Sequence, residues 1–241
     1  LKVASKDNYN KRTNDLSIHI NRLPAPKTKP EEAASFYKGD LPIPARYVGY
    51  THNQESFKFL MDPMLNIGLE KVSAMGYGNA INVLSDVEGG LAKYFSQKFA
   101  QVTNPPLDSI RELDGMTLRV SLGEKPHFGE SRSHQIILNS PILKMSEILK
   151  IKEQNFTPVK TFNILYEPSF ENSEKNEKKL ITEIDKIALD VTKFARKKGG
   201  IAILSDRNMS KKFAAIPLIL VVSAINQKLI EEGLRLKLSL V

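Results

Sequence analysis

VKTFNILY at residues 159–166 and IAIL at residues 201–204 are the two stretches that decide the fold. Both are rich in β-branched and aromatic residues and predict strands, and LRLKLSLV at residues 234–241 predicts a third. Between these strands lie residues 172–198 and 216–232, in which apolar side chains recur at helical spacing. This order predicts parallel βαβ units with right-handed crossovers, in an α/β fold that is an open sheet or an incomplete barrel with flanking helices.

Glycine and proline mark the ends of these segments. Gly199 and Gly200 turn the chain between the first helix and the second strand, and Gly233 stops the second helix. Pro217 is expected in the first turn of that helix, where its missing N–H is tolerated. The last residue of the sequence, Val241, lies at the end of a predicted strand. We therefore expect a domain truncated at its C-terminal end, with the open strand edge covered by something outside this chain.

The first part of the chain differs in composition from the rest. Residues 1–45 are polar and contain five prolines, which favour extended backbone and deny long helices. We expect an extended linker there, with an edge strand at residues 17–23. Residues 46–241 are expected to form one domain.

The first half of that domain is expected to be compact. A helix is predicted over residues 52–68, N-capped by Thr51 and split at Pro63. A short helix over residues 147–151 follows Ser146, its predicted cap. The other expected elements are strands at residues 80–84, 117–122 and 136–138 and a helix at residues 89–102.

Composition narrows the classes of function. With 41% hydrophobic and 26% charged residues among 241, the chain has the make-up of a soluble globular protein. It has no cysteine, so it supplies no disulfide, thiol nucleophile or iron–sulfur ligand. The net charge of +8 would suit nucleic acid, but the lysines are scattered and no aromatic residues alternate with them. No apolar run reaches the ~18 residues of a membrane helix.

Candidate reactive residues are sparse. The four histidines form no i, i+4 pair, so no metal site is predicted. The loop at residues 75–79 has a GxG pattern without a third glycine, which favours a tight turn over a phosphate cradle. The tripeptide Leu-Ser-Asp occurs twice, ending at Asp86 and at Asp206, each time after a short apolar strand. Ligands bind at the carboxyl ends of parallel strands, and the alternative is that these residues cap a turn.

Several motifs resemble a known family. YVGYTH at residues 47–52, DPM at residues 62–64 and YFSQKFAQVTNPPLDSIRE at residues 94–112 occur in this order, followed by LNSPIL at residues 138–143. Together they resemble the central domain of the glutamate synthase large subunit, from about residue 40 onward. The chain departs from the family pattern at Gly78, Ala80 and Ser109.

The resemblance implies a role within a larger enzyme. Glutamate synthases hydrolyse glutamine in an amidotransferase domain, and ammonia passes through a tunnel to an FMN-bearing domain. In the FMN-bearing domain ammonia adds to 2-oxoglutarate. The iminoglutarate formed is then reduced to glutamate by electrons that pass through a 3Fe-4S cluster. The central domain links the two, so the amidotransferase and FMN domains are the implied partners, without nucleic acid or membrane. No cofactor is expected in this chain, which alone should be inactive. The implied location is the cytoplasm, or the plastid in a photosynthetic eukaryote.

The resemblance also implies which residues line the ammonia tunnel. They are Thr103, Asn104, Pro105 and Pro106. Two successive prolines remove two N–H donors and fix φ, which makes a rigid wall, and the threonine and asparagine side chains can hydrogen-bond ammonia. We expect Arg111 to anchor this loop. The alternative is a helix C-terminal stop without a channel role.

Two other classes of function remain open from the residues alone. One is a stand-alone small-ligand or nucleotide-binding α/β module that uses the strand ends near Asp86 and Asp206. The other is a basic nucleic-acid-binding protein. The sequence leaves open whether the parent enzyme takes electrons from ferredoxin, NADPH or NADH.

Overall fold

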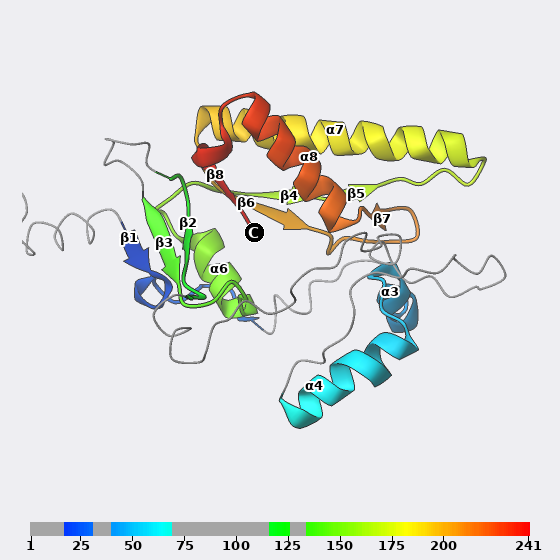
Figure 1. The fold of residues 1–241 in the computed structure, drawn as a ribbon, viewed down its shortest axis with the longest axis horizontal. Coiled ribbons are helices and arrows are strands. Elements are labelled where there is room, and N and C mark those ends of the chain that lie inside the picture. Colours follow the sequence, from blue (N-terminus) through cyan, green and yellow to red (C-terminus); the bar gives the residue numbers. More distant parts are fainter. Residues whose placement is uncertain (1–16, 31–39, 69–115, 126–133) are drawn as a thin grey trace, which may run out of the picture. The chain divides into compact units, whose positions relative to one another are not determined.

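The computed structural model describes residues 17–30, 40–68, 116–125 and 134–241 (Figure 1). The chain divides into two compact units. Leu1–Gly39 and Met116–Val241 form the first unit, and Asp40–Gly115 form the second.

A parallel sheet is the centre of the first unit. It contains β4 (Val159–Asn163), β6 (Gly200–Ser205) and β8 (Leu238–Leu240) in the order β4-β6-β8, and both pairs are parallel. The crossovers are α7 (Ser173–Lys197) and α8 (Leu218–Glu231). The two helices lie on the same face of the sheet in Figure 1. The predicted βαβ order is therefore confirmed, and the sheets of the described residues are open rather than closed into a barrel.

Two apolar cores lie on the two faces of this sheet. Because β6 is the middle strand, its side chains are buried on both sides: Ala202 belongs to one core, and Ile201 and Ile203 to the other. The first core joins the sheet to α7 and α8 through side chains such as Val191 and Ile225, both fully buried. Burial of an aliphatic side chain of this kind contributes about 1.5–3 kcal/mol, so the two helices are held mainly by this face.

The second core joins the sheet to a smaller one. This smaller sheet has the order β1-β3-β2, from β1 (Ser17–His19), β2 (Val120–Leu122) and β3 (Gln135–Leu138). The middle strand β3 pairs with β1 in parallel and with β2 in antiparallel orientation. The helix α6 (Met145–Glu153) adds the buried Ile151 to this core. The edge strand expected at the start of the chain is thus confirmed at β1.

The ends of α7 follow from its sequence. Asn172 is the N-cap, and its side chain accepts a hydrogen bond from the Lys175 backbone N–H at 2.7 Å. Gly199 and Gly200 follow the helix with φ of 68° and 104°. A Cβ on Gly200 would lie 2.2 Å from the Pro158 carbonyl oxygen, so only glycine fits there.

Some predicted boundaries of the first unit are wrong. The strand expected at residues 159–166 is broken: β4 is followed by β5 (Leu165–Tyr166), which pairs antiparallel with β7 (Ala214–Ala215). The strand expected at residues 234–241 begins as the 3-10 helix η5 (Arg235–Lys237). Pro217 is the N-cap of α8 rather than a residue of its first turn. The predicted cap Ser146 lies inside α6, whose N-cap is Lys144. A 3-10 helix, η2 (Ile20–Arg22), follows β1 within the expected edge strand.

The second unit is described over residues 40–68. It contains α3 (Ile43–Gly49), the π-helix η3 (Ser56–Met61) and α4 (Asp62–Ile67). The predicted long helix therefore changes its winding just before Pro63, which has no N–H to donate. Thr51 has φ of 62° and does not cap a helix, contrary to the prediction. The strand and helix predicted at residues 80–84 and 89–102 lie outside the described residues. None of the described helices has the length and hydropathy needed to cross a bilayer.

Candidate functional site

Most of the residues singled out from the sequence lie outside the described part of the chain. These are Asp86, Thr103, Asn104, Pro105, Pro106 and Arg111. Their assignment to an ammonia tunnel, a loop anchor or a strand end stays a prediction. Asp206 is described, and it follows β6 directly.

The strand-end site around Asp206 consists of turn contacts. The Asp206 carbonyl oxygen accepts a hydrogen bond from the Met209 backbone N–H at 3.2 Å. The Ser205 hydroxyl accepts a hydrogen bond from the Arg207 backbone N–H at 3.5 Å. The Asn208 amide lies 3.4 Å from the Asn163 side-chain oxygen at the end of β4. The ends of two parallel strands thus bring amide and hydroxyl groups together, which suits hydrogen bonding to a polar group.

The rest of this loop closes on itself. The Ser210 backbone N–H donates to the Phe213 carbonyl oxygen at 2.9 Å, and the Phe213 N–H donates to the Ser210 hydroxyl at 3.1 Å. Met209 is only 3% exposed and anchors the loop. In the described ranges no three His, Asp or Glu side chains gather as metal ligands.

A basic cleft lies between β4 and the last turns of α7. It has a volume of about 420 Å³. We call it the lysine cleft, and it is lined by Pro158, Val159, Lys160, Asp190, Lys193, Phe194, Lys197 and Lys198. Four of these residues are lysines and one is an aspartate, whose carboxylate accepts a hydrogen bond from Lys193 at 3.1 Å. The cleft therefore carries a net positive charge.

Packing beneath the lysine cleft fixes its geometry. The Phe194 ring meets the Phe162 ring of β4 edge-on, with 6.0 Å between centroids. Asp190, Lys193, Phe194 and Lys197 are linked by spacings of three and four residues, so they form one stripe of the helix, and this stripe lines the cleft together with Val159 and Lys160 of β4. The Lys160 ammonium lies 4.7 Å from the Phe162 ring centroid, which holds it on the same face of the sheet.

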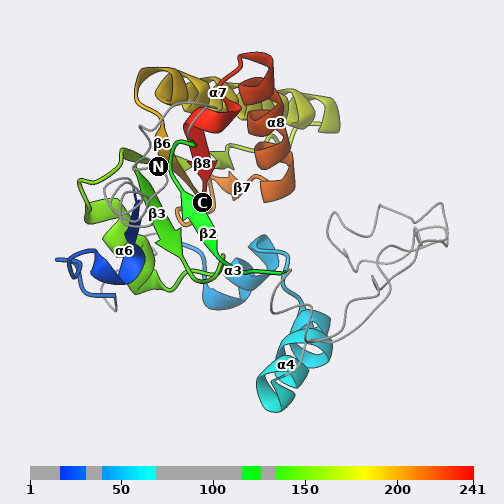
Figure 2. The ribbon, with the colours of Figure 1, turned by 60° about the vertical axis from the view of Figure 1, so that its left-hand side comes forward.

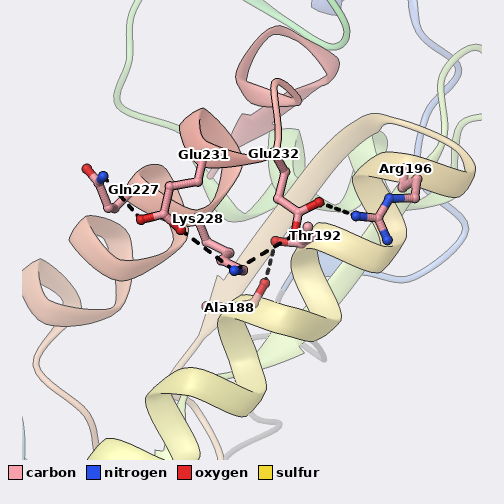
Figure 3. A network of polar contacts seen from close by, with 7 residues as sticks. All are labelled: Ala188, Thr192, Arg196, Gln227, Lys228, Glu231 and Glu232. Atoms are coloured by element: carbon pink, nitrogen blue, oxygen red, sulfur yellow. Dashed lines mark hydrogen bonds and ion pairs between the residues drawn. The ribbon is translucent and has the colours of Figure 1, made fainter.

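The opposite flank of α7 faces α8 through a polar network (Figure 3). The Glu232 carboxylate bridges the two helices: it pairs with Arg196 of α7 and lies 3.8 Å from the Lys228 ammonium of α8. Below it, the buried Thr192 hydroxyl donates to the Ala188 carbonyl oxygen at 2.8 Å. Exposed ion pairs contribute only about 0.2–1 kcal/mol each, so the rotation of α7 about its axis is set mainly by the apolar side chains that it buries in the first core. That rotation turns the lysine flank toward β4.

A buried hydroxyl connects the two sheets of the first unit. The Gly123 backbone N–H donates to the Ser239 hydroxyl at 3.0 Å, and this hydroxyl donates to the Gly123 carbonyl oxygen at 2.9 Å. Lys237 and Glu124 form an ion pair beside it. Figure 2 shows β2 and β8, which these contacts join, side by side.

Two ionisable groups that line neither site have shifted pKa values, although Lys186 lies near Asp190 of the lysine cleft. The pKa of Glu153 is lowered, chiefly because the Lys27 backbone N–H donates to its carboxylate at 2.5 Å, with the Thr28 N–H at 3.3 Å. The pKa of Lys186 is raised by its hydrogen bond to the Glu183 carboxylate at 2.8 Å. Both shifts arise from local contacts at the surface.

Sequence reasoning missed the lysine cleft. A run of lysines such as Lys193 to Lys198 near a helix C-terminus usually forms a solvated face, and the sequence alone does not distinguish this run from that arrangement. The structure adds Lys160, from a strand more than thirty residues earlier, to the same cleft. The sequence does contain one signal for the cleft. Asp190, Lys193 and Lys197 are spaced so that they lie on one flank of the helix, and this flank also carries Phe194.

The fold and its contacts define a class of protein: an α/β domain with parallel βαβ units, whose described polar contacts mainly join one element to another. The family follows from comparison with known proteins. Residues 45–241 match the model of the family described as glutamate synthase central domain. The chain belongs to this family, as its motifs at residues 47–52 and 94–112 indicated.

The relatives are much longer proteins. The glutamate synthase [NADPH] large chain of Bacillus subtilis (strain 168) is 32% identical over 245 residues, which cover 99% of this chain and 15% of that protein. The ferredoxin-dependent glutamate synthase of Cyanidium caldarium is 33% identical over 196 residues, which cover 80% of this chain and 12% of that protein. A chloroplastic ferredoxin-dependent glutamate synthase of Oryza sativa subsp. japonica is 30% identical over 198 residues, with the same coverage. The chain thus spans 12–15% of the length of these curated relatives.

Proposed function

We propose that this chain is the central linking domain of a longer glutamate synthase subunit, an oxidoreductase that converts glutamine, 2-oxoglutarate and a reductant into two molecules of glutamate. The family match over residues 45–241 carries this proposal. The large-chain relatives support it, because the chain corresponds to one segment of each. The proposed location is the cytoplasm, or the plastid as in the chloroplastic relatives.

The role proposed for the domain is that of a scaffold between the amidotransferase and FMN domains. The cofactors expected in the whole subunit are proposed to bind outside this chain. A 3Fe-4S cluster needs cysteine thiolates, and the 241 residues contain none. The helices α7 and α8, whose N-caps are Asn172 and Pro217, lack the preceding glycine-rich loop that commonly cradles a phosphate. These observations support a place for FMN and the cluster in other parts of the proposed subunit.

The domain is also proposed to form part of the ammonia tunnel wall at Thr103, Asn104, Pro105 and Pro106. The support is the sequence TNPP, whose prolines stiffen the backbone and whose polar side chains can exchange hydrogen bonds with ammonia. Arg111 is proposed to anchor this segment. Ammonia is a small neutral molecule, so weak and replaceable hydrogen bonds suit its passage better than a charged site.

The test of this function compares the chain with the longer product of its gene. Both are purified, and flavin absorbance and glutamine-dependent glutamate synthesis are measured with ferredoxin, NADPH and NADH as donors. The proposal expects flavin and turnover in the longer protein and neither in the 241-residue chain. Stoichiometric flavin or turnover in the chain alone would contradict it.

A further inference from the structure

We propose that the outer edge of β4 and the lysine cleft together form a docking site for an acidic segment, which adds to the parallel sheet as an extended strand. This inference does not depend on the function proposed above. It combines two independent features of one place in the fold: a strand edge with no partner among the described residues, and a cleft whose four lysines outnumber its one aspartate.

The first feature is the backbone of β4. In the described part of the chain β4 pairs with β6 alone. The Ile201 N–H donates to the Pro158 carbonyl oxygen and the Ile164 N–H to the Ser205 carbonyl oxygen, both at 2.9 Å. Backbone groups of successive strand residues point alternately to the two sides, so even-numbered residues face β6. The N–H and C=O groups of residues 159, 161 and 163 therefore point outward, as a template for another strand.

The second feature is the charge beside that edge. Lys160 shares the α7 face of the sheet with Phe162, and Lys193 and Lys197 lie one helical turn apart above it. A strand laid along β4 would direct every second side chain toward these ammonium groups. Glutamate or aspartate at those positions would complement them, and Asp190 would disfavour a basic segment. The charge pattern thus selects an acidic occupant and fixes which of its faces carries the carboxylates.

The shape of the site favours a peptide over nucleic acid. Single-stranded nucleic acid needs exposed aromatic rings on which bases stack. The aromatic residue that lines this cleft is Phe194, and its ring packs against the buried Phe162 beneath the cleft. An edge strand offers hydrogen bonds that match a peptide backbone instead. We therefore assign the site to a polypeptide.

Binding of a designed peptide to the 241-residue chain tests the site. The probe is a fluorescent peptide of about nine residues, the length of a long strand, that alternates glutamate with threonine and valine. One control peptide carries glutamine in place of glutamate, and another is N-methylated at alternate amides so that it cannot pair as a strand. Fluorescence anisotropy gives the affinities. We expect the probe to bind, and both control peptides to bind at least about tenfold more weakly.

Matched variants of the chain separate the site from its general positive charge. Lys193→Glu with Lys197→Glu reverses two lysines in the cleft, and Lys175→Glu with Lys179→Glu makes the same change at the same spacing at the other end of α7. The first pair should weaken binding by at least about tenfold and the second by less than about threefold. Thr161→Pro removes one outward N–H, which an edge strand tolerates, and should abolish binding, whereas Thr161→Val should not.

Three results would overturn the proposal. If both charge-reversal double variants lost peptide affinity equally, the binding would depend on the general positive charge of the chain and not on this site. Undiminished binding of the N-methylated peptide would exclude strand addition, and this result does not depend on whether the Thr161→Pro variant folds. Binding of a single-stranded oligonucleotide that requires Lys193 and Lys197, without binding of the peptide, would assign the cleft to nucleic acid.

Discussion

Replacing Ser239 with alanine should weaken the contact between the β4-β6-β8 sheet and the β1-β3-β2 sheet. The Ser239 hydroxyl accepts the Gly123 N–H and donates to the Gly123 carbonyl oxygen, and both residues are buried. Alanine fills nearly the same space but leaves both backbone groups without a partner. A buried group left in this way costs about 1–3 kcal/mol, so the variant should lose about 2–4 kcal/mol of unfolding free energy.

Thermal and urea unfolding followed by circular dichroism measure this loss. In a chain of this length, 1 kcal/mol shifts Tm by about 2–4 °C, so we expect Tm to fall by roughly 5–15 °C. The matched control is Ser140→Ala, which removes a hydroxyl that accepts the Ile142 N–H at 3.2 Å in a solvent-accessible turn. Water replaces that contact, and the control should lose no more than about 0.5 kcal/mol.

Equal stability losses in Ser239→Ala and Ser140→Ala would refute the reasoning. So would a loss below about 0.5 kcal/mol in the Ser239 variant, because it would mean that the two backbone groups find other partners. Either result would remove this hydroxyl as the link between β2 and β8.

Three further predictions concern other parts of the fold. Gly200→Ala should destabilise the chain by about 3 kcal/mol or more, because its Cβ would lie 2.2 Å from a carbonyl oxygen, whereas Gly68→Ala, with open space around it, should cost about 1 kcal/mol in urea unfolding. Arg196→Ala should lower the free energy of unfolding by at most about 1 kcal/mol. The difference in urea unfolding between this variant and the unchanged chain should become smaller as salt is added. The Glu153 carboxylate has a lowered pKa, so its contribution to stability is present above the ordinary carboxyl pKa and is lost as the pH falls through the lowered value. Glu153→Gln should therefore reduce Tm at neutral pH but not in acid, and an equal reduction at both pH values would count against this contact.

The sequence predicts the βαβ order because its signals are local. Helical spacing in residues 172–198, the glycine pair after them and the apolar run of β6 each specify one element, and packing then joins them. The break between β4 and β5 is different. The Ile164 N–H donates to Ser205 of β6, while its carbonyl oxygen accepts from Ile216, so the chain changes partners within one residue. That change depends on residues some fifty positions away and leaves no local pattern.

The same distinction applies to the sites. The TNPP segment was found through its resemblance to a family, since neither spacing nor composition identifies a tunnel. The lysine cleft was missed because it joins Lys160 to residues of a later helix, and the tertiary packing that includes the contact between Phe162 and Phe194 brings them together. Asp206 was singled out because a Leu-Ser-Asp tripeptide follows a short apolar strand, and it does lie directly after β6, while a binding role for it stays a prediction.

Ammonia balance in the longer subunit tests the proposed channel role most directly. Thr103→Val with Asn104→Leu removes the polar groups of the TNPP segment without adding charge. The measurement is the ratio of free ammonia released to glutamate formed during glutamine-dependent turnover, with synthesis from added ammonia as the control. The account predicts that free ammonia rises several-fold while the control rate is unchanged. An unchanged ratio, with glutaminase and synthase activities still coupled, would contradict it.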